Sequence, residues 1–494
     1  MKYCHVVVNQ MNLIIFVINQ PDYYMKKSLS VLFLLLFVSI TLSSQSALNQ
    51  FINNPALKHA SVGVHVVDLK SGETIVSHDS NKSLTPASIT KIITTATALE
   101  MLGDNYRYET KVGIDAENPN RILVLGAGDP TLGSSVLDIN PNLFFINIAS
   151  AAKRTLSSDR EYEILVVDNL FGYEGISPEW TWIDMGNYYA AGSYGISVFD
   201  NTYKLFFDTT NPKPRIIRTE PEMKDITFQN FLSLNTTGSD NGYLYGMPFS
   251  NERIIRGNIP AGRKEFSIKG DIPNPGLFLG ETVADYLRSS GIKVGIVKTI
   301  QEEFLSGINK EYKIGTMLHT QVSPPLSEIV REVNVTSNNH YAEHLIRTIG
   351  NENDSKLRSL PNGINFIKSF WNRKGINTTS LTLYDGSGLA PQNAFSPQFL
   401  TDILVYMNNN SSHKKVFFDS LPKAGQEGTL RNFLKNSRYD SKISAKSGSI
   451  GGVHCYSGYL IDGEKQYAFT VMVNKFNGTR PQVRSAIEKF LLSL

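Results

Sequence analysis

The sequence is poor in cysteine, in long apolar runs and in any excess of one charge. Only Cys4 and Cys455 occur among its 494 residues, which excludes a small fold held together by several disulfides. The apolar run at residues 29–42 is shorter than the roughly 20 residues that a membrane-spanning helix needs. The 48 basic and 45 acidic residues are spread along the chain, so we expect no nucleic-acid partner.

The composition is that of a globular protein, with 41% hydrophobic and 19% charged residues. The length predicts two or three domains rather than one core. Near the amino terminus, Met25-Lys26-Lys27, the apolar run and the small pair Ser43-Ser44 follow one another in the order of a signal peptide. We therefore expect residues 1–44 to be an upstream extension and a signal peptide, and the protein to be exported. Retention of the run as an anchor is the alternative.

Strand signals at the two ends of the chain predict one shared sheet. Val62, Val64 and Val66 alternate with other residues before a turn at 70–73, which indicates a hairpin. Two extended runs, 455–461 and 467–473, lie near the carboxyl end and precede an amphipathic helix over 481–494. We expect Cys455, which cleavage would leave alone, to be a small buried strand residue.

The middle of the chain, from about 106 to 280, has short strand-like runs separated by Asn, Asp, Gly and Pro, and little helical periodicity. It predicts a β-rich insertion that is itself interrupted. The predicted catalytic domain is 45–105 with 281–494, the inserted domain is 106–208 with 262–280, and the nested inserted domain is 209–261.

Three short motifs carry the chemistry, and their order gives them weight. They are Ser88-Ile89-Thr90-Lys91, Ser337-Asn338-Asn339 and Lys446-Ser447-Gly448. Together they supply a nucleophile, a base, a proton relay and a carboxylate anchor for acyl transfer through a serine ester. Ser-x-x-Lys alone is weak, since it recurs at Ser150/Lys153 and at three other places.

The first motif is predicted to open a helix, with Thr85 as its cap, Pro86 at the first helical position and Gly103 just past its end. Ser88 then lies in the first turn, where free backbone N–H groups favour negative charge. Lys91, three residues on, lies beside it on one face. To act as a base Lys91 must be neutral, which requires burial or a neighbouring cation such as Lys446 to lower its pKa.

The second motif lies between two predicted helices, 325–335 and one beginning near 339. The Ser337 hydroxyl can pass a proton from Lys91 to a leaving amine. Asn339 can orient Lys91 and hydrogen-bond a substrate amide.

The third motif begins a strand-like segment. There Lys446 and the Ser447 hydroxyl can hold a terminal carboxylate, and Gly448 lets a substrate lie against bare backbone. The backbone N–H groups of Ser88 and Ser449 are the predicted oxyanion hole, worth ~3 kcal/mol of barrier per donor.

With these motifs in order, the chain from about Asn53 onward resembles the class C penicillin-binding proteins, the D-alanyl-D-alanine carboxypeptidases and endopeptidases of peptidase family S13. Further segments carry the resemblance: Gly128-Asp129-Pro130-Thr131-Leu132, Asp168-Asn169 with Trp180-Thr181-Trp182, Asp385-Gly386-Ser387-Gly388-Leu389, and Gly425 with Gly428-Thr429-Leu430. The long separation of Ser88 from Ser337 matches the domains that this family inserts there. Asn338 and Ser447 stand where the family usually has Asp and Thr.

The resemblance implies an α/β (α+β) fold, with a serine β-lactamase/transpeptidase-like catalytic domain and β-rich inserted domains. It implies a serine-type D-Ala-D-Ala carboxypeptidase, also able to act as an endopeptidase, that forms an acyl-enzyme on peptidoglycan stem peptides. β-Lactam antibiotics would be covalent inhibitors, and no metal or organic cofactor is expected. It also implies that Asp168 lies in the substrate-binding pocket and that the enzyme works in the periplasm or cell envelope, with a possible peripheral membrane association.

Three alternatives remain open at this point. A serine β-lactamase would use the same nucleophile but would need a water-activating group, which no segment identifies. A zinc metallopeptidase would use His340, Glu343 and His344, which form a His-x-x-Glu-His pattern. A wall-binding or sensor protein would keep the fold without the chemistry.

Overall fold

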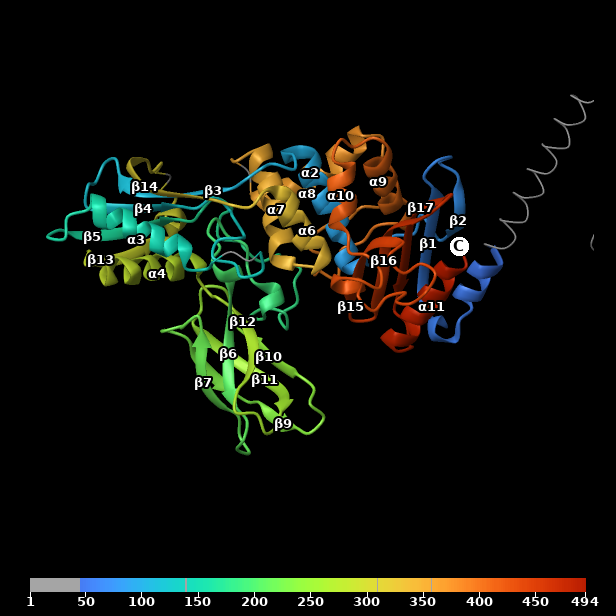
Figure 1. Ribbon diagram of the computed structural model, residues 1–494, viewed down its shortest axis with the longest axis horizontal. Coiled ribbons are helices and arrows are strands. Elements are labelled where there is room, and N and C mark those ends of the chain that lie inside the picture. The colour runs from blue at the N-terminus through green and yellow to red at the C-terminus, as the bar shows by residue number, and fades with distance from the viewer. Residues whose placement is uncertain (1–44, 138–139, 309, 357) are drawn as a thin grey trace, which may run out of the picture.

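The computed structural model describes residues 45–494 except 138–139, 309 and 357, and consists of three lobes (Figure 1). The predicted signal peptide and upstream extension lie outside the described residues. Within the described part, no helix has both the length and the apolarity to cross a bilayer.

The central sheet joins the two ends of the chain, as the sequence predicts. Its strands are β1 (Ser61–Asp68), β2 (Thr74–His78), β15 (Ile443–Ile450), β16 (Val453–Asp462) and β17 (Lys465–Asn474). Their order is β15-β16-β17-β1-β2, and every neighbouring pair is antiparallel. Ser61 pairs with Asn474 and Asp68 with Tyr467. Cys455 is buried in β16, opposite Gly448.

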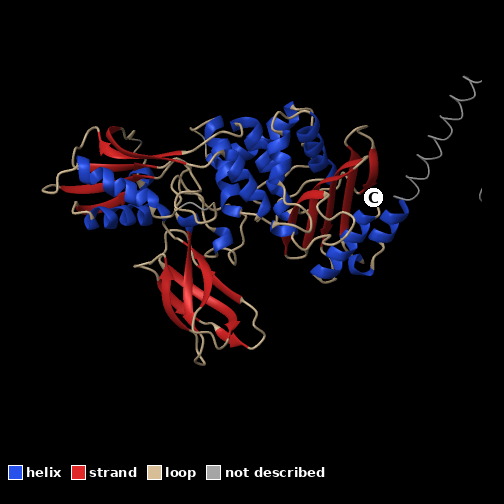
Figure 2. Ribbon diagram, viewed as in Figure 1, coloured by secondary structure: helices blue, strands red, loops and turns tan. Residues whose placement is uncertain are grey.

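Helices cover both faces of this sheet (Figure 2). They are α2 (Thr90–Leu102), α6 (Leu326–Val335), α7 (Asn339–Asn353), α8 (Ser359–Arg373), α9 (Pro397–Asn409), α10 (Lys414–Ser420) and α11 (Arg480–Leu492). The α2 residues Ile92, Ile93, Ala96 and Leu99 are fully buried. They lie at the helical spacing that packs one face into a core, which fixes the helix that follows Ser88 in place. On the opposite face of the sheet, α11 packs its own apolar stripe.

The first inserted lobe has a mixed sheet flanked by helices. Its strands are β3 (Glu109–Asp115), β4 (Arg121–Leu125), β5 (Glu161–Val167), β13 (Lys293–Thr299) and β14 (Ile314–Val322), in the order β13-β5-β4-β3-β14. Helices α3 (Leu143–Thr155) and α4 (Pro275–Ser289) share its core, and α5 (Gln301–Leu305) follows β13. The sequence reading missed α3, because its opening Leu-Phe-Phe-Ile run also has the composition of a strand.

The second inserted lobe is nearly all strand. Its strands are β6 (Thr202–Asp208), β7 (Arg215–Glu220), β8 (Thr227–Asn230), β9 (Ser233–Asn235), β10 (Asn241–Tyr245), β11 (Glu252–Pro260) and β12 (Phe266–Asp271). They form two small sheets, β12-β6-β7 and β10-β11-β8 with β9 paired to β11. One small core, which includes Leu205, Phe207, Leu244 and Ile255, lies between them.

The observed boundaries of the lobes differ from the predicted domain boundaries. We expected the catalytic domain to resume at 281, but β13 is hydrogen-bonded to β5, and β14 to β3, so the first inserted lobe runs to Val322. We expected the nested domain at 209–261, but β6 and β12 pair with each other and share its core, so that lobe spans about 202–272. In both cases a strand pairing distant in sequence decides the boundary, and local composition does not reveal it.

Candidate active site

Ser88 lies in a short 3-10 turn, Ala87–Ile89, that runs directly into α2. The expected Thr85 cap is wrong: the turn has no side-chain cap, and the Thr85 hydroxyl donates to Pro391 O instead. Strand β15 lies against this turn, and a Cβ at position 448 would lie 2.5 Å from Pro86 O and 3.1 Å from Ser88 N. Gly448 is therefore required for the third motif to approach the serine.

Lys91 is the centre of the cluster. Its Nζ donates to Ser88 Oγ at 3.1 Å, to Asn339 Oδ1 at 2.6 Å and to Ser387 O at 2.7 Å. The side chain is fully buried, and this burial lowers the pKa of Lys91 to about 7. An amine with that pKa is neutral in a large fraction of molecules near neutrality and is within hydrogen-bond reach of the serine proton.

The second motif turns sharply into α7. Ser337 has a φ of 64°, in the left-handed region, and the Asn338 side chain caps the helix by accepting from Tyr341 N at 3.1 Å. An asparagine caps a helix as well as an aspartate does, which explains why Asn338 suffices at this position. Asn339 accepts from Lys91 and donates through Nδ2 to Tyr189 O at 2.8 Å, so it links the base to a loop of the inserted lobe.

The third motif brings a second lysine to the cluster. Lys446 Nζ donates to Ser337 Oγ at 2.8 Å and to Ser447 O at 2.9 Å. Burial, and then the charge of Lys91, hold the pKa of Lys446 well below its usual range. Of the two causes expected for a lowered pKa of Lys91, burial or a neighbouring cation such as Lys446, burial is the one that acts, and it is the pKa of Lys446 that the charge of its neighbour lowers.

The remaining residues of the third motif lie at the open side of the cluster. Ser447 is half-buried and Ser449 is exposed. Both lie on β15, where they pair with Tyr456 and His454 of β16. The structure thus brings residues of all three motifs to one edge of the central sheet.

The sequence reading missed the support behind Lys91. Glu343 Oε1 accepts from the backbone N–H groups of Gly386 and Ser387 at 3.0 and 2.8 Å, and it thereby fixes the loop whose Ser387 carbonyl accepts from Lys91. Asp385 holds the other side of this loop by accepting from Gly388 N and Ala390 N. The Asp-Gly-Ser-Gly segment was the only sequence signal of this arrangement.

The His-x-x-Glu-His residues have contacts of their own on a buried face of α7. His340 Nε2 lies 2.7 Å from Ser197 Oγ, and His344 Nδ1 lies 2.9 Å from Gly128 O. Glu343 is bound to the 386–387 loop. These contacts join α7 to the inserted lobe and to the loop beneath Lys91. They give the residues of the His-x-x-Glu-His pattern a structural role.

Asp168 does not lie with the three motifs. It is 3% exposed, its carboxylate accepts from the Tyr173 hydroxyl, and burial raises its pKa to about 6. This enclosure within the inserted lobe argues against the expected substrate-pocket role, which stays a prediction. Asp184 is the carboxylate near the cluster: it accepts from Tyr189 OH at 3.1 Å, and the carbonyl of Tyr189 is the one that Asn339 binds.

Comparison with known proteins identifies the family. The chain matches the model of the D-Ala-D-Ala carboxypeptidase 3 (S13) family over residues 44–494, so it belongs to that family. It is 27% identical over 455 residues to a D-alanyl-D-alanine carboxypeptidase of an Actinomadura species, covering 88% of this chain and 81% of that protein. It is 22% identical over 458 residues to D-alanyl-D-alanine carboxypeptidase DacB of Haemophilus influenzae, covering 90% of this chain and 91% of that one.

Solved structures confirm the predicted fold class. Penicillin binding protein 4 (dacB) from Haemophilus influenzae matches with a TM-score of 0.74 at 19% identity, over 90% of this chain and 97% of that chain. A complex of the same protein with a β-lactam matches with a TM-score of 0.70 at 18% identity. At these identities the likeness establishes the fold alone.

Proposed function

We propose that this chain is a serine-type D-Ala-D-Ala carboxypeptidase that acts on peptidoglycan stem peptides through an acyl-enzyme on Ser88. The observation that carries the proposal is the contact of the Lys91 amine with Ser88 Oγ at 3.1 Å, in a buried setting that lowers the pKa of Lys91 to about 7. Family membership supplies the substrate class.

In the proposed acylation, neutral Lys91 accepts the Ser88 proton as Oγ attacks the carbonyl of the D-Ala-D-Ala bond. The oxyanion is held by the backbone N–H groups of Ser88 and Ser449. The tetrahedral intermediate then breaks its C–N bond, and Lys91 returns its proton to the leaving amine through the hydroxyl of Ser337, which also accepts a hydrogen bond from Lys446. Water hydrolyses the resulting ester and regenerates the serine.

The terminal carboxylate of the substrate is proposed to lie beside Lys446 and Ser447. Lys446 is fully buried, and among the described residues no carboxylate forms an ion pair with it. A bound carboxylate would supply that counter-charge, restore the ammonium form and strengthen the contact, because the site excludes water. Tyr189, whose carbonyl binds Asn339, and Asp184, which accepts from the Tyr189 hydroxyl, are the proposed wall against which the rest of the stem peptide lies.

The same serine can cleave peptide cross-links, which also present a D-Ala carbonyl, so endopeptidase activity belongs to the proposal. β-Lactams would acylate Ser88 for the same reason. Export to the periplasm or cell envelope, and any peripheral association with the membrane, rest on the amino-terminal pattern alone.

The test is mass spectrometry of peptidoglycan fragments incubated with the purified protein. Loss of one alanine from a stem peptide marks carboxypeptidase activity, and splitting of cross-linked dimers marks endopeptidase activity. Ser88→Ala should abolish both. A penicillin adduct on Ser88 that persists for minutes supports the peptidase, whereas rapid turnover would make the protein a β-lactamase.

A further inference from the structure

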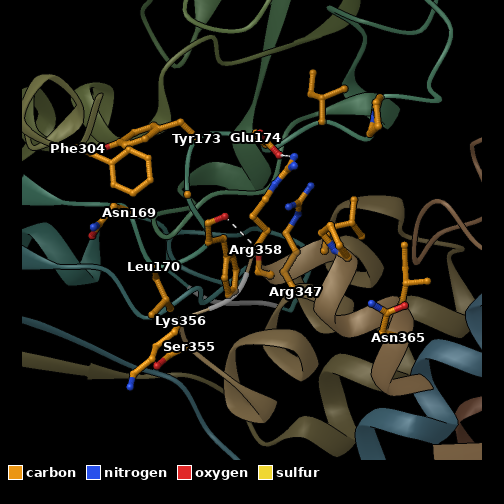
Figure 3. A pocket seen from close by; sticks show the side chains of 18 of the residues that line it. Asn169, Leu170, Tyr173, Glu174, Phe304, Arg347, Ser355, Lys356, Arg358 and Asn365 are labelled. Atoms are coloured by element: carbon orange, nitrogen blue, oxygen red, sulfur yellow. Dashed lines mark hydrogen bonds and ion pairs between the residues drawn. The ribbon is translucent and has the colours of Figure 1, made fainter. Parts of the chain in front are cut away.

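A cavity away from the three motifs lies between the first inserted lobe and the helices of the catalytic lobe (Figure 3). Its volume is about 580 Å³, and none of the residues of the three motifs lines it. Its walls are the loop 169–178 after β5, Phe304 of α5, residues 355–356, residues 358–361 at the start of α8, and Tyr384. Cavities of this size between domains are common places for small-molecule binding.

Arg347 of α7 lines this cavity, and among the described residues no carboxylate forms an ion pair with it (Figure 3). The side chain is 1% exposed, and its Nε and Nη2 atoms are buried without a hydrogen-bond partner. No ion pair to Arg347 occurs among the residues that the structure describes. A buried guanidinium without a counter-charge is unfavourable unless a ligand satisfies it.

Glu343, one helical turn earlier on α7, fills this role only in part: burial lowers the pKa of Arg347, and the charge of Glu343 opposes that shift from beyond ion-pair distance. Its Oε1 is occupied by the N–H groups of the 386–387 loop, and the carboxylate makes no ion pair with Arg347 within 4 Å. Glu343 therefore supports the catalytic loop and leaves the guanidinium of Arg347 without a directly bound carboxylate.

The rest of the cavity combines positive charge with apolar walls. Arg358 pairs with Glu174, while Lys356 is exposed and adds a further positive charge. The walls include Phe171 and Leu360, both largely buried. An apolar cavity with a positively charged lining fits a ligand that has one carboxylate and an apolar body.

We propose that this cavity binds a carboxylate with an apolar body, held by Arg347. A guanidinium binds a carboxylate through two parallel N–H donors, and the contact is strong where water is excluded. The ligand is either the stem peptide of the proposed substrate or a free N-acylated amino acid. Only the first of these sources rests on the proposed function.

The experiment measures thermal unfolding of the full chain with increasing N-acetyl-L-leucine, and with N-acetyl-L-leucinamide as the uncharged match. Binding to the folded state raises the unfolding temperature by mass action. We expect the acid to raise it and the amide to leave it unchanged. Because Lys446 is a second possible carboxylate anchor, the titration is repeated with Lys446→Met, in which the effect should persist.

Three variants assign the effect to the cavity. Arg347→Met should weaken binding of the acid by about tenfold or more, because it removes the fork that holds the carboxylate. Arg347→Lys should retain part of the binding, since it keeps the charge without the fork. Arg331→Met, at an exposed arginine paired with Glu427, is the control and should bind as the unchanged protein does.

The proposal is overturned if the acid fails to stabilise the unchanged protein, or if it stabilises Arg347→Met equally. It is also overturned if the effect disappears in Lys446→Met. A stem tetrapeptide that competes with N-acetyl-L-leucine supports the cell-wall source, and one that does not compete leaves the free N-acylated amino acid as the ligand. Both of these outcomes keep the cavity as a carboxylate-binding site. The unfolding temperature can be measured whether or not the protein has peptidase activity.

Discussion

Two fully buried arginines, one in the second inserted lobe and one in the catalytic lobe, have opposite surroundings. Arg253 donates to Asp271 Oδ1 at 3.0 Å and to the carbonyls of Ser250 and Glu252 at 2.6 and 3.0 Å. Arg347 has no such partner among the described residues. The small lobe uses its buried charge as an internal cross-link, whereas the catalytic lobe leaves its arginine unpaired.

Two buried lysines of the catalytic lobe, Lys91 and Lys446, resemble Arg347 in this respect. Lys91 and Lys446 are both fully buried and both bind only neutral oxygen atoms. Neither has a carboxylate within ion-pair distance in the described part of the chain. Buried positive charge without a counter-charge therefore concentrates where chemistry or a ligand is proposed, and paired charge lies where only structure is needed.

The largest expected effect in this comparison is the slower acylation that follows the loss of the base, Lys91. Lys91→Met should slow acylation of Ser88 by a labelled penicillin by about 10³–10⁴-fold, since general-base catalysis contributes about that much. The folded state should lose little stability, because the removal of a buried charge without an ionic partner offsets the loss of the donor to Asn339 Oδ1 and Ser387 O. Mass spectrometry of the adduct with time gives the rate, and thermal unfolding gives the stability. A rate close to that of the unchanged protein would show that Lys91 is not the base.

Arg253→Met should have the opposite effects, a loss of stability with no change in the acylation rate. It leaves Asp271 buried without its partner, so we expect the second inserted lobe to lose about 3–5 kcal/mol of stability. Native-state hydrogen exchange of amides in β6, β11 and β12 measures this locally. The acylation rate of the remaining folded protein should be unchanged. Adding Asp271→Asn should restore part of the loss, and a double variant as unstable as the single one would argue against the ion pair.

A smaller effect is expected in the pH dependence. Protonated Lys91 cannot accept a proton, so acylation should fall as the pH is lowered through about 7, the pKa of this lysine. The charge of Glu343 raises the pKa of Lys91, so Glu343→Gln should move the midpoint of this fall to lower pH. Glutamine keeps an oxygen for the 386–387 loop, whereas Glu343→Ala should also reduce the maximal rate. A midpoint that stays fixed in Glu343→Gln would contradict the electrostatic link.

The smallest effect is expected at Asp168. Because its carboxylate is enclosed within the inserted lobe, Asp168→Asn should change kcat/KM for a stem peptide by less than about twofold. Asp184→Asn provides the comparison at the edge of the site and should change KM more than kcat. A large loss in Asp168→Asn with normal folding would restore its predicted role in the substrate pocket.

The parts of the site that could be predicted are those encoded in a few consecutive residues. Ser88 and Lys91 are one helical turn apart, and strands such as 121–125 are marked by a short apolar run between turns. Glu343 could not be assigned, because its partners Gly386 and Ser387 become neighbours only in the folded chain. The ends of the lobes and helix α3 were missed for a related reason, since sheet pairing and core packing outweigh local preference there.

The antiparallel pairing of β1 with β17 also dictates when the enzyme can first become active. Strand β1 begins at residue 61 and pairs with β17, which ends at residue 474. Nearly the whole polypeptide must therefore be synthesised before the central sheet can form. Lys446 belongs to that late segment and reaches Ser337 only after β15 has docked. A nascent or truncated chain that already contains the nucleophile therefore stays inert until its last strands are in place.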